Sequence, residues 1–381
     1  MANTNLKKAK AAKNDEFYTQ LEDIEAELRH YPEYFKDKTI FCNCDDPFES
    51  NFTLFFLMHF NRLGLKRLIS TGYATSPIAG RKIKKEGTYC LDISDTKHAL
   101  KENQKDLNAN DALHMLQTEV NLMKILNGDE EHLAGDFRSK ESLIFLEESD
   151  VVVGNPPFSL FREYITMLEK HEKKYLIIGE VNQITDKDFF PLIESGKVWM
   201  GITMNGTGAH WFEVPKDYKN KNVKVVDGKR LMTNGRACWW TNLDYAERHN
   251  LQPLGYQYTN HESDYPKYDN YDVIDIGFPV KNGKRRGDFF RTPYDYSEIM
   301  GIPVTALGKL CPEQFEIIGI TASWCESPSV KLLKTSKKKR HNPIMKGIEL
   351  YRRLLVRNRQ PDRTDWENWQ REIDEARKGY K

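Results

Sequence analysis

Short apolar runs of strand length alternate with longer segments of helical spacing in the first half of the chain, and this alternation constrains the fold most. Phe52–Leu63 and Phe161–His171 have helix-compatible apolar spacing, and Leu21, Ile24 and Leu28 fall on one helical face. The strand-length runs are Thr39–Cys42, Arg67–Ser70, Ser142–Leu146, Val151–Val153, Tyr175–Ile178 and Val198–Ile202. Such alternation predicts an α/β fold built on a doubly wound sheet, with ligands at the carboxyl ends of its strands.

The pattern changes beyond about residue 245, where tyrosine-, proline- and glycine-rich sequence surrounds scattered short strands such as Glu316–Ala322. We therefore expect two domains, a larger one over residues 1–245 and a smaller one over residues 246–381. Near the end of the chain, a predicted helix carries Trp366, Trp369 and Ile373 on one face. We interpret this face as a docking surface on the protein core.

Composition excludes several classes of protein. With 381 residues, 39% of them apolar and 30% charged, the chain can form a sizeable core and an extensive solvated surface. Apolar runs such as Leu54–Met58 are far too short to span a membrane, and no charged start followed by an apolar run stands at Met1. The six cysteines lack CxxC spacing and a nearby histidine ligand. We therefore expect a cytoplasmic protein with reduced thiols and no metal site.

A dense basic segment lies near the C-terminus of a chain whose formal net charge is only +1. Residues 331–360 contain eleven lysines and arginines against a single acid. Four of the basic residues are consecutive, namely Lys337, Lys338, Lys339 and Arg340. Such an accumulation indicates a segment that binds a polyanion. The alternative is a solvated tail, but the interleaved Leu350, Tyr351 and Leu354 favour partial folding.

The motif with the clearest chemistry follows the apolar run at residues 151–153 and consists of Asn155, Pro156, Pro157 and Phe158. Each proline lacks a backbone N–H, so the turn presents carbonyl acceptors without competing donors, and the Asn155 amide adds another acceptor. Together they can accept both hydrogens of an exocyclic amine while Phe158 stacks on the ring that bears it. The lone pair would then stay on nitrogen and could attack a sulfonium methyl directly. The alternative reading is an ordinary turn at the end of a strand.

In these residues the chain resembles the S-adenosylmethionine-dependent DNA adenine-N6 methyltransferases, specifically the EcoRI-type modification methylases. The resemblance is collinear and covers most of the chain. In the first half it rests on Asn14–Thr19, Cys42–Pro47, Ser50–Phe52, Gly135–Ser139, Asn155–Tyr164 and Tyr175–Gly179. In the second half it rests on Trp240–Leu243, Tyr265–Asp272, Met300–Thr305 and Gln314–Gly319. It implies a Rossmann-like methyltransferase sheet in the first domain and a DNA target-recognition domain in the second.

The resemblance also implies a binding site for S-adenosylmethionine. The residues matched to the family's N-terminal cofactor motif are Phe17, Tyr18 and Thr19. The loop at residues 43–47 stands in the place of the family's Phe-x-Gly-x-Gly motif but lacks both glycines. In this loop Asn43 is expected to line the site, and Asp45 and Asp46 to attract the ammonium group of the methionine moiety. An alternative reading makes both acids caps of a helix that begins near Ser50.

Two further elements are matched to the cofactor site. Asp136, followed by Phe137, resembles the acid that accepts a hydrogen bond from the cofactor's adenine amine. Asn155 of the catalytic motif is expected to line the same site. The acid that should hold the ribose hydroxyls is not obvious; Asp92 is one option, but we favour a surface carboxylate for that residue.

Substrate handling follows from geometry, because the N6 amine of a paired adenine lies inside the duplex. Similar enzymes flip the base out at a cost of a few kcal/mol, and stacking on Phe158, at about 1–3 kcal/mol per base, would offset part of it. The basic segment at 331–360 would bind DNA phosphates. Target recognition could involve the tyrosine-rich stretch 256–271 and the loop 281–286, although each could equally be a core or turn feature. The basic residues at the end of that loop are Lys284, Arg285 and Arg286.

The prediction is therefore a DNA adenine-N6 methyltransferase that works as a monomer on double-stranded DNA. Whether it works beside a cognate restriction endonuclease is left open. One alternative is an RNA or protein amino-group methyltransferase, because the same motif suits other planar amines. A second is a catalytically inactive DNA-binding homologue, because the loop at 43–47 departs from the family pattern.

Overall fold

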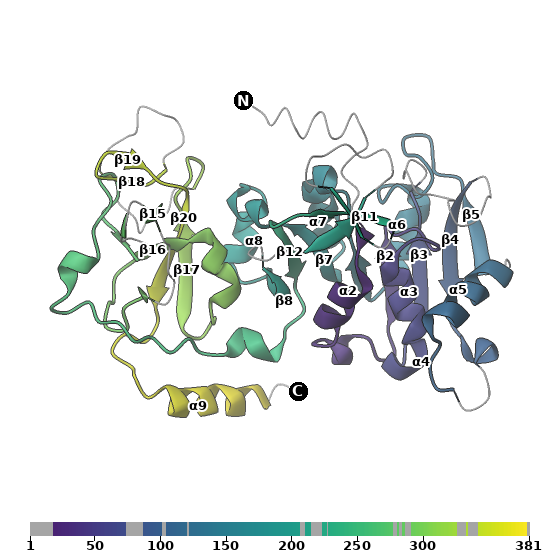
Figure 1. Ribbon diagram of the computed structural model, residues 1–381, viewed down its shortest axis with the longest axis horizontal. Coiled ribbons are helices and arrows are strands. Elements are labelled where there is room, and N and C mark those ends of the chain that lie inside the picture. The colour runs from purple at the N-terminus through teal and green to yellow at the C-terminus, as the bar shows by residue number, and fades with distance from the viewer. Residues whose placement is uncertain are drawn as a thin grey trace. The chain divides into compact units, whose positions relative to one another are not determined.

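The structure is a computed structural model, and it describes residues 18–73, 87–100, 104–119, 122–205, 210–214, 223–226, 228–276, 280–281, 284–285, 291–325, 333 and 342–378. The chain folds into two compact units (Figure 1). The first comprises the described residues up to Val181 together with Met200–Asp244. The second comprises Asn182–Trp199 with the described residues from Tyr245 onward. The domain limits of 1–245 and 246–381 stay predictions.

The first unit is built around an eight-stranded mixed sheet. Its order is β5 (Met123–Leu126), β4 (Thr88–Ile93), β3 (Arg67–Thr71), β2 (Thr39–Asn43), β6 (Val151–Gly154), β7 (Lys174–Glu180), β12 (Ala237–Thr241) and β8 (Trp199–Asn205). The central strands β3, β2, β6 and β7 run parallel, whereas β4, β5 and β12 are antiparallel to their neighbours. In the sheet, β3 lies beside β2 on one side and β6 lies beside β2 on the other, so the strand order reverses at β2. A crevice is therefore expected at the carboxyl ends of β2 and β6.

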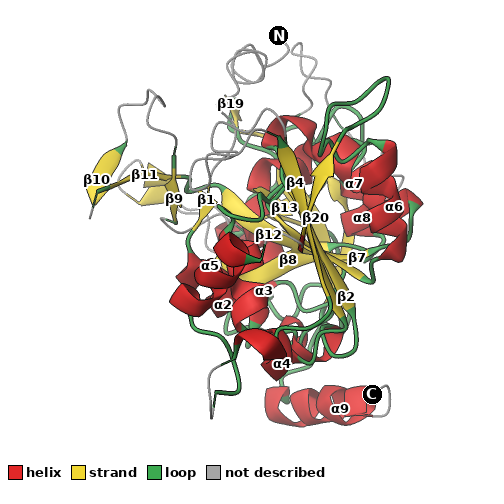
Figure 2. Cartoon of the chain, turned by 90° about the vertical axis from the view of Figure 1, so that its right-hand side faces the viewer, coloured by secondary structure: helices red, strands yellow, loops and turns green. Residues whose placement is uncertain are grey.

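Helices cover both faces of this sheet, so the predicted α/β fold is confirmed. Figure 2 shows α2, α3 and α5 on one side of the strands and α6 and α7 on the other. The helices are α2 (Leu21–Leu28), α3 (Asn51–Met58), α4 (Phe60–Leu63), α5 (Ala109–Thr118), α6 (Lys140–Glu148) and α7 (Phe161–Lys170). The expected helices around residues 21–28, 52–63 and 161–171 are confirmed, the second one interrupted at His59.

The expected strand at residues 142–146 is wrong, because this segment lies within α6. Ser139 caps the helix, and its hydroxyl accepts a hydrogen bond from the Ser142 N–H at 3.2 Å. Ser142 and Leu146, four residues apart, form the buried face. A short apolar run fits a buried helical turn as well as a strand, and here the cap favours the helix.

A second, four-stranded antiparallel sheet belongs to the same unit and was not expected from the sequence. Its order is β1 (Tyr18–Thr19), β9 (Trp211–Glu213), β11 (Lys229–Thr233) and β10 (Lys224–Val226). β1 immediately precedes α2, and in β9 Glu213 lies opposite Tyr18 and Phe212 opposite Thr19. This small sheet therefore joins the N-terminal motif to a segment far along the chain.

The second unit contains a four-stranded sheet of order β13 (Ile274–Asp275), β16 (Met300–Pro303), β20 (Arg353–Asn358) and β17 (Phe315–Ile320). It also contains the two-stranded hairpins β14 (Val280–Lys281) with β15 (Lys284–Arg285) and β18 (Ile344–Met345) with β19 (Ile348–Glu349). Its α-helices are α8 (Phe190–Glu194) and α9 (Trp366–Lys378). Short 3-10 helices in the chain are η1 (Pro32–Tyr34), η2 (Lys97–Ala99), η4 (Phe158–Leu160), η5 (Val181–Thr185), η6 (Ala246–His249), η7 (Glu262–Asp264) and η9 (Val304–Lys309).

The apolar face of α9 packs on the core of the second unit, as predicted. Trp369 and Ile373 are buried in a cluster with Leu251 and Cys311, and Trp366 packs against that cluster. The basic segment is also partly folded, because its apolar residues at 354–356 are buried in β20. Both findings agree with the expectation that interleaved apolar residues mark folded sequence.

All six cysteines carry free thiols. Burial raises the pKa of the Cys90 thiol to about 12, so this side chain stays protonated at neutral pH. Among the described residues, no group of three or more histidine, cysteine, aspartate and glutamate side chains could hold a metal ion. None of the helices in the described part of the chain is long and apolar enough to cross a membrane.

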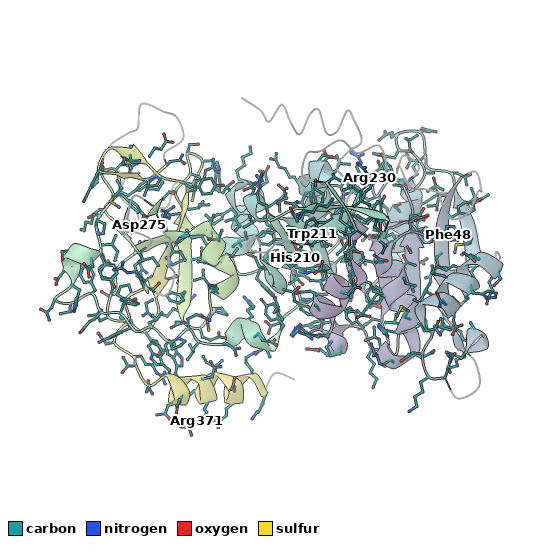
Figure 3. The ribbon with its side chains drawn as sticks, viewed as in Figure 1. Phe48, His210, Trp211, Arg230, Asp275 and Arg371 are labelled. Atoms are coloured by element: carbon teal, nitrogen blue, oxygen red, sulfur yellow. The ribbon has the colours of Figure 1, made fainter. Side chains whose placement is uncertain are left out.

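A buried ion pair joins two strands of the second unit. Arg353 Nε in β20 lies 3.4 Å from Asp275 Oδ2 in β13, and Asp275, labelled in Figure 3, is fully buried. Replacing Asp275 with asparagine removes the charge and leaves the guanidinium buried without its counter-ion. We expect Asp275→Asn to lower the free energy of unfolding by about 3 kcal/mol in urea denaturation.

The matched control is Glu316→Gln, which breaks a half-exposed pair with Arg357 at 3.4 Å. Its cost should stay below about 1 kcal/mol, because solvent screens exposed charges. Equal losses in the two variants would contradict the buried-pair argument.

Candidate functional site

An open pocket lies where β2, β3 and β6 end. It encloses about 460 Å³ of space, part of which is open solvent. The lining residues are Tyr18, Thr19, Cys44, Asp45, Asp46, Ser50, Asn51, Phe52, Tyr73 and Asn155. They come from the loops after these three strands, from β1 and from the start of α3. Five of them are residues that the sequence matched to the cofactor site, namely Tyr18, Thr19, Asp45, Asp46 and Asn155.

Asp45 is held between the ends of β2 and β6, with only 6% of its surface exposed. Its Oδ1 accepts a hydrogen bond from Ser50 Oγ at 2.7 Å, and its Oδ2 accepts one from the Asn155 N–H at 3.3 Å. Ser70 Oγ donates to its backbone carbonyl at 2.6 Å. Gly154 permits this packing, because a Cβ there would come within 3.0 Å of Asp45 Oδ2. The carboxylate therefore links the loop after β2 to the motif after β6.

Asp46 also lines the pocket, but one of its oxygens caps a turn. Its Oδ1 accepts hydrogen bonds from the N–H groups of Phe48 and Glu49 at 2.9 and 3.2 Å. The following helix, α3, is capped by Ser50, whose hydroxyl accepts from the Phe52 N–H at 3.0 Å. The alternative that the two acids cap this helix is therefore wrong: Ser50 caps the helix, and Asp46 caps the turn before it.

Besides the hydroxyl of Tyr164, two buried polar groups at this end of the sheet have no hydrogen-bond partner among the described residues. One is Thr19 Oγ1, which belongs to a residue that lines the pocket. Asn51 Nδ2 donates to the Thr19 carbonyl at 2.7 Å and so holds β1 against α3. The other is Nδ2 of Asn43, a fully buried residue that does not line the pocket. The Oδ1 atom of the same side chain accepts a hydrogen bond from the Thr71 hydroxyl at 3.3 Å. Because buried polar groups are nearly always paired, the Thr19 hydroxyl is suited to a polar group of a ligand.

The Asn-Pro-Pro-Phe motif leaves β6 at the edge of the pocket. Asn155 lines the pocket, Pro156 is buried, and Phe158 is partly exposed at the start of η4. The Pro157 carbonyl accepts a hydrogen bond from the Leu160 N–H at 2.9 Å. One lone pair of that carbonyl is therefore engaged within the turn.

Asp136 and Phe137 do not belong to the pocket lining. Arg138 binds both oxygens of Asp136, with Nε 2.9 Å from Oδ1 and Nη2 2.7 Å from Oδ2. Burial raises the pKa of the Asp136 carboxyl, but the hydrogen bonds from Arg138 outweigh it and the pKa lies below its usual value. Phe137 packs edge-on against Tyr164 with ring centroids 5.0 Å apart. Oδ1 also accepts a hydrogen bond from the Arg138 backbone N–H at 2.9 Å, so Arg138 contacts both oxygens of this carboxylate.

Asp92 belongs to an ion cluster across β3, β4 and β5 and does not line the pocket. Arg67 contacts its two oxygens at 2.6 and 2.9 Å, and Lys124 Nζ lies 2.8 Å from Oδ2. The hydrogen bonds from Arg67 hold the pKa of the Asp92 carboxyl below its usual value. With 12% of its side chain exposed, Asp92 is a largely buried, ion-paired strand residue and not the surface carboxylate expected from the sequence, and its contacts also argue against a role at a ribose.

Cys44 adopts the left-handed conformation that a glycine of the missing motif would supply, with φ of +68°. This region costs a residue with a Cβ about 1–2 kcal/mol. We expect Cys44→Gly to keep or slightly raise the stability, because the strain is relieved while backbone freedom increases. Cys44→Val, with its branched Cβ, should lower the free energy of unfolding by about 1–2 kcal/mol. Thermal unfolding of the ligand-free proteins tests this, and equal stability of the two variants would contradict the strain argument.

Most of the basic residues expected to bind DNA cannot be placed. Five of them lie outside the described residues, namely Arg286, Lys337, Lys338, Lys339 and Arg340. Phe17 of the cofactor motif also lies outside the described residues. Lys284 and Arg285 form β15, but their side chains are outside the description.

The tyrosine-rich stretch proves to be largely a core feature of the second unit. Tyr265, Tyr268 and Tyr271 are buried, and the last two belong to a hydrophobic cluster with Leu355. Tyr256, in contrast, is 44% exposed. Tyr258, the fifth tyrosine of the stretch, is partly exposed, so Tyr256 and Tyr258 reach the surface of this unit.

Sequence reasoning assigned no role to several pocket residues, namely Cys44, Ser50, Asn51, Phe52 and Tyr73. A signal for Ser50 was present, because a serine directly before an apolar helical run is a typical N-cap, and helix N-termini attract polar ligands. Tyr73 carries no such signal, since its place in the pocket depends on how β3 ends beside β2.

The chain matches known proteins over most of its length. The family model described as adenine-specific methyltransferase EcoRI matches residues 5–359. The Type II methyltransferase M.EcoRI of Escherichia coli is 42% identical over 318 residues, which are 82% of this chain and 88% of that protein. The Type II methyltransferase M.MpnI of Mycoplasma pneumoniae is 31% identical over 362 residues, which are 93% of this chain and 98% of that protein. No solved structure matches the chain significantly.

Proposed function

This chain belongs to the family of adenine-specific methyltransferases of the EcoRI type, and from that premise we propose that it transfers a methyl group from S-adenosylmethionine to the N6 amine of adenine in double-stranded DNA. The observation that carries the proposal is the meeting of Asp45 and Asn155 in one pocket. An acid suited to a cationic donor and an amide suited to an amine are joined by the hydrogen bond from the Asn155 N–H to Asp45 Oδ2, at 3.3 Å.

The pocket residues fit S-adenosylmethionine, which when bound supplies an electrophilic methyl group on a sulfonium. The nearly buried Asp45 carboxylate would bind the ammonium group, because Ser50 and Asn155 already orient both of its oxygens. Asp46 would add negative charge beside it through its second oxygen. The buried Thr19 hydroxyl would pair with a polar group of the ligand, and Tyr18 would offer aromatic surface to the adenine ring.

The acceptor amine would be held by Asn155 and Pro156. Their oxygens can accept both amine hydrogens and keep the lone pair on nitrogen, so that attack on the methyl needs no covalent enzyme intermediate. One nitrogen–carbon bond forms as one sulfur–carbon bond breaks, and the proton lost from nitrogen leaves to bulk water. Phe158, partly exposed beside Asn155, would stack on the flipped base and offset part of the cost of extruding it.

DNA binding outside the pocket is proposed from charge. The segment 331–360 would contact phosphates through the consecutive Lys337, Lys338, Lys339 and Arg340. Lys284, Arg285 and Arg286 are proposed to contact the target site, and residues 246–381 to read its sequence. Action as a monomer and the presence of a cognate endonuclease stay predictions.

The experiment that tests this function is transfer from methyl-labelled S-adenosylmethionine to unmethylated duplex DNA, followed by nucleoside analysis. N6-methyladenine at one recurring sequence is the expected product. Parallel reactions offer single-stranded DNA, RNA and a protein mixture. Label in RNA or protein alone, or in a methylated cytosine, would overturn the choice of substrate, and donor binding without any transfer would indicate an inactive homologue.

A further inference from the structure

The small sheet in the first unit carries one continuous face that leads away from the pocket. Directly opposed residues in a sheet share a face. Tyr18 lies opposite Glu213, Glu213 opposite Leu231, and Leu231 opposite Lys224, so these four residues form one row across all four strands. Trp211, two residues before Glu213 along β9, lies on the same face.

Over β1, β9 and the end of β11 the opposite face of this sheet is buried, so the row with Tyr18 is the outer one there. Thr19, Phe212 and Met232 form the neighbouring row, and all three are buried. Tyr18 lines the pocket, whereas Lys224 at the far end of the outer row is exposed. The outer face therefore begins at the pocket and ends at the β10–β11 hairpin.

The hairpin projects from the rest of the first unit (Figure 2). Its strands are paired as far as Val226 opposite Lys229, and Gly228 in the connecting turn has φ of +78°, as tight hairpin turns require. Val225 and Val226 are 66% and 47% exposed. An exposed two-stranded arm thus extends from the sheet that holds Tyr18.

The outer face combines cations with an aromatic ring. Lys224 Nζ lies 5.2 Å from the centroid of the Trp211 ring, labelled in Figure 3, and Lys229 is exposed on the same face. Glu213 is the single acid among the described residues of this sheet. Charge and ring together suit an anionic partner with apolar sugar surface, which is the chemistry of a nucleic-acid backbone.

We propose that the β10–β11 hairpin and the outer face of this sheet bind the phosphate backbone of the duplex beside the flipped base. The inference rests on the proposed function, since it takes DNA as the substrate of the pocket. Three strand spacings of about 4.8 Å separate Tyr18 from Lys224, so the two lie roughly 14 Å apart across the sheet. That distance corresponds to about four base pairs of duplex at 3.4 Å each. Lys224 thus lies about four base-pair steps from the edge of the pocket that Tyr18 lines, within the reach of a duplex whose flipped base enters that pocket.

The test is the double variant Lys224→Gln/Lys229→Gln, with binding to a short fluorescent duplex of random sequence measured over a range of salt concentrations. Loss of two phosphate contacts should reduce the slope of log K against log salt by about 2. Binding at low salt should be about tenfold weaker. Affinity for S-adenosylmethionine should not change, because neither lysine lines the pocket.

The matched control is Lys36→Gln/Lys66→Gln, which removes the same charge from two exposed lysines before β2 and β3, at the end of the sheet opposite the pocket. It should keep the wild-type slope. The inference is overturned if the hairpin variant also keeps that slope. It is likewise overturned if the variant self-associates, because the lysines would then serve only to prevent the edge strand from pairing with another molecule. If the wild-type protein neither binds nor methylates duplex DNA, the proposed function fails and the inference with it.

Discussion

Replacing Asn155 with alanine is expected to lower the rate of methyl transfer by about 10²–10³-fold while the affinity for S-adenosylmethionine stays nearly unchanged. The side-chain amide is the group that would keep the amine lone pair on nitrogen, and this interaction strengthens as the amine attacks. Asn155 contacts Asp45 through its backbone N–H, which alanine retains. The carboxylate that would bind the donor should therefore keep its position, and the variant should lose chemistry without losing the donor.

Single-turnover rates with labelled donor and calorimetric titration of S-adenosylmethionine separate the two effects. Asn250→Ala, at an exposed asparagine of the second unit, is the control for loss of an amide side chain and should behave as wild type. Asn155→Asp keeps an acceptor oxygen of the same reach and should retain more activity than alanine. A wild-type rate in Asn155→Ala would show that the amine is held elsewhere. A loss of affinity for S-adenosylmethionine as large as the loss of rate would show that the Asn155 side-chain amide binds the methyl donor instead of the acceptor amine.

The parts of the site that could be predicted from sequence are those fixed by local rules. A buried strand followed by Asn-Pro-Pro has few conformations, so β6 and Asn155 were correctly placed at the carboxyl edge of the sheet. Asp45 and Asp46 lie in the loop after β2, where the resemblance to the methylase family placed them. The loop forms without glycine, because Cys44 takes the left-handed conformation at a modest cost.

The parts that could not be predicted depend on contacts between distant segments. The sheet that holds Tyr18 and Thr19 pairs them with Glu213 and Phe212, and no local signal specifies that pairing. Asp136 was matched to a role at the cofactor, but its neighbour Arg138 occupies both oxygens, which depends on the rotamer of one long side chain. Local sequence patterns therefore place the chemistry, whereas tertiary contacts decide which polar groups remain available to a ligand.

Gly154→Ala should be nearly as damaging as the loss of Asn155, although it removes no functional group. A Cβ at this position would come within 3.0 Å of Asp45 Oδ2 and lie 3.3 Å from the Asn43 carbonyl. The Asp45 side chain cannot turn away cheaply, because it is buried and holds hydrogen bonds to Ser50 and to the Asn155 N–H. We expect the carboxylate to shift and the hydrogen bond between the two motifs to break.

A displacement of this size in a site that aligns donor and acceptor costs about 10²-fold in rate. Unlike Asn155→Ala, the Gly154 variant should also bind S-adenosylmethionine more weakly, by about tenfold, because the shifted acid faces the donor. Gly255→Ala is the matched control, since a Cβ there would meet no atom within 4 Å, and it should leave both quantities unchanged. Thermal unfolding of both variants must show that the fold is kept. If Gly154→Ala then lowers the rate but leaves donor affinity untouched, Asp45 does not bind the donor, and its function is only to hold the Asn155 backbone in place.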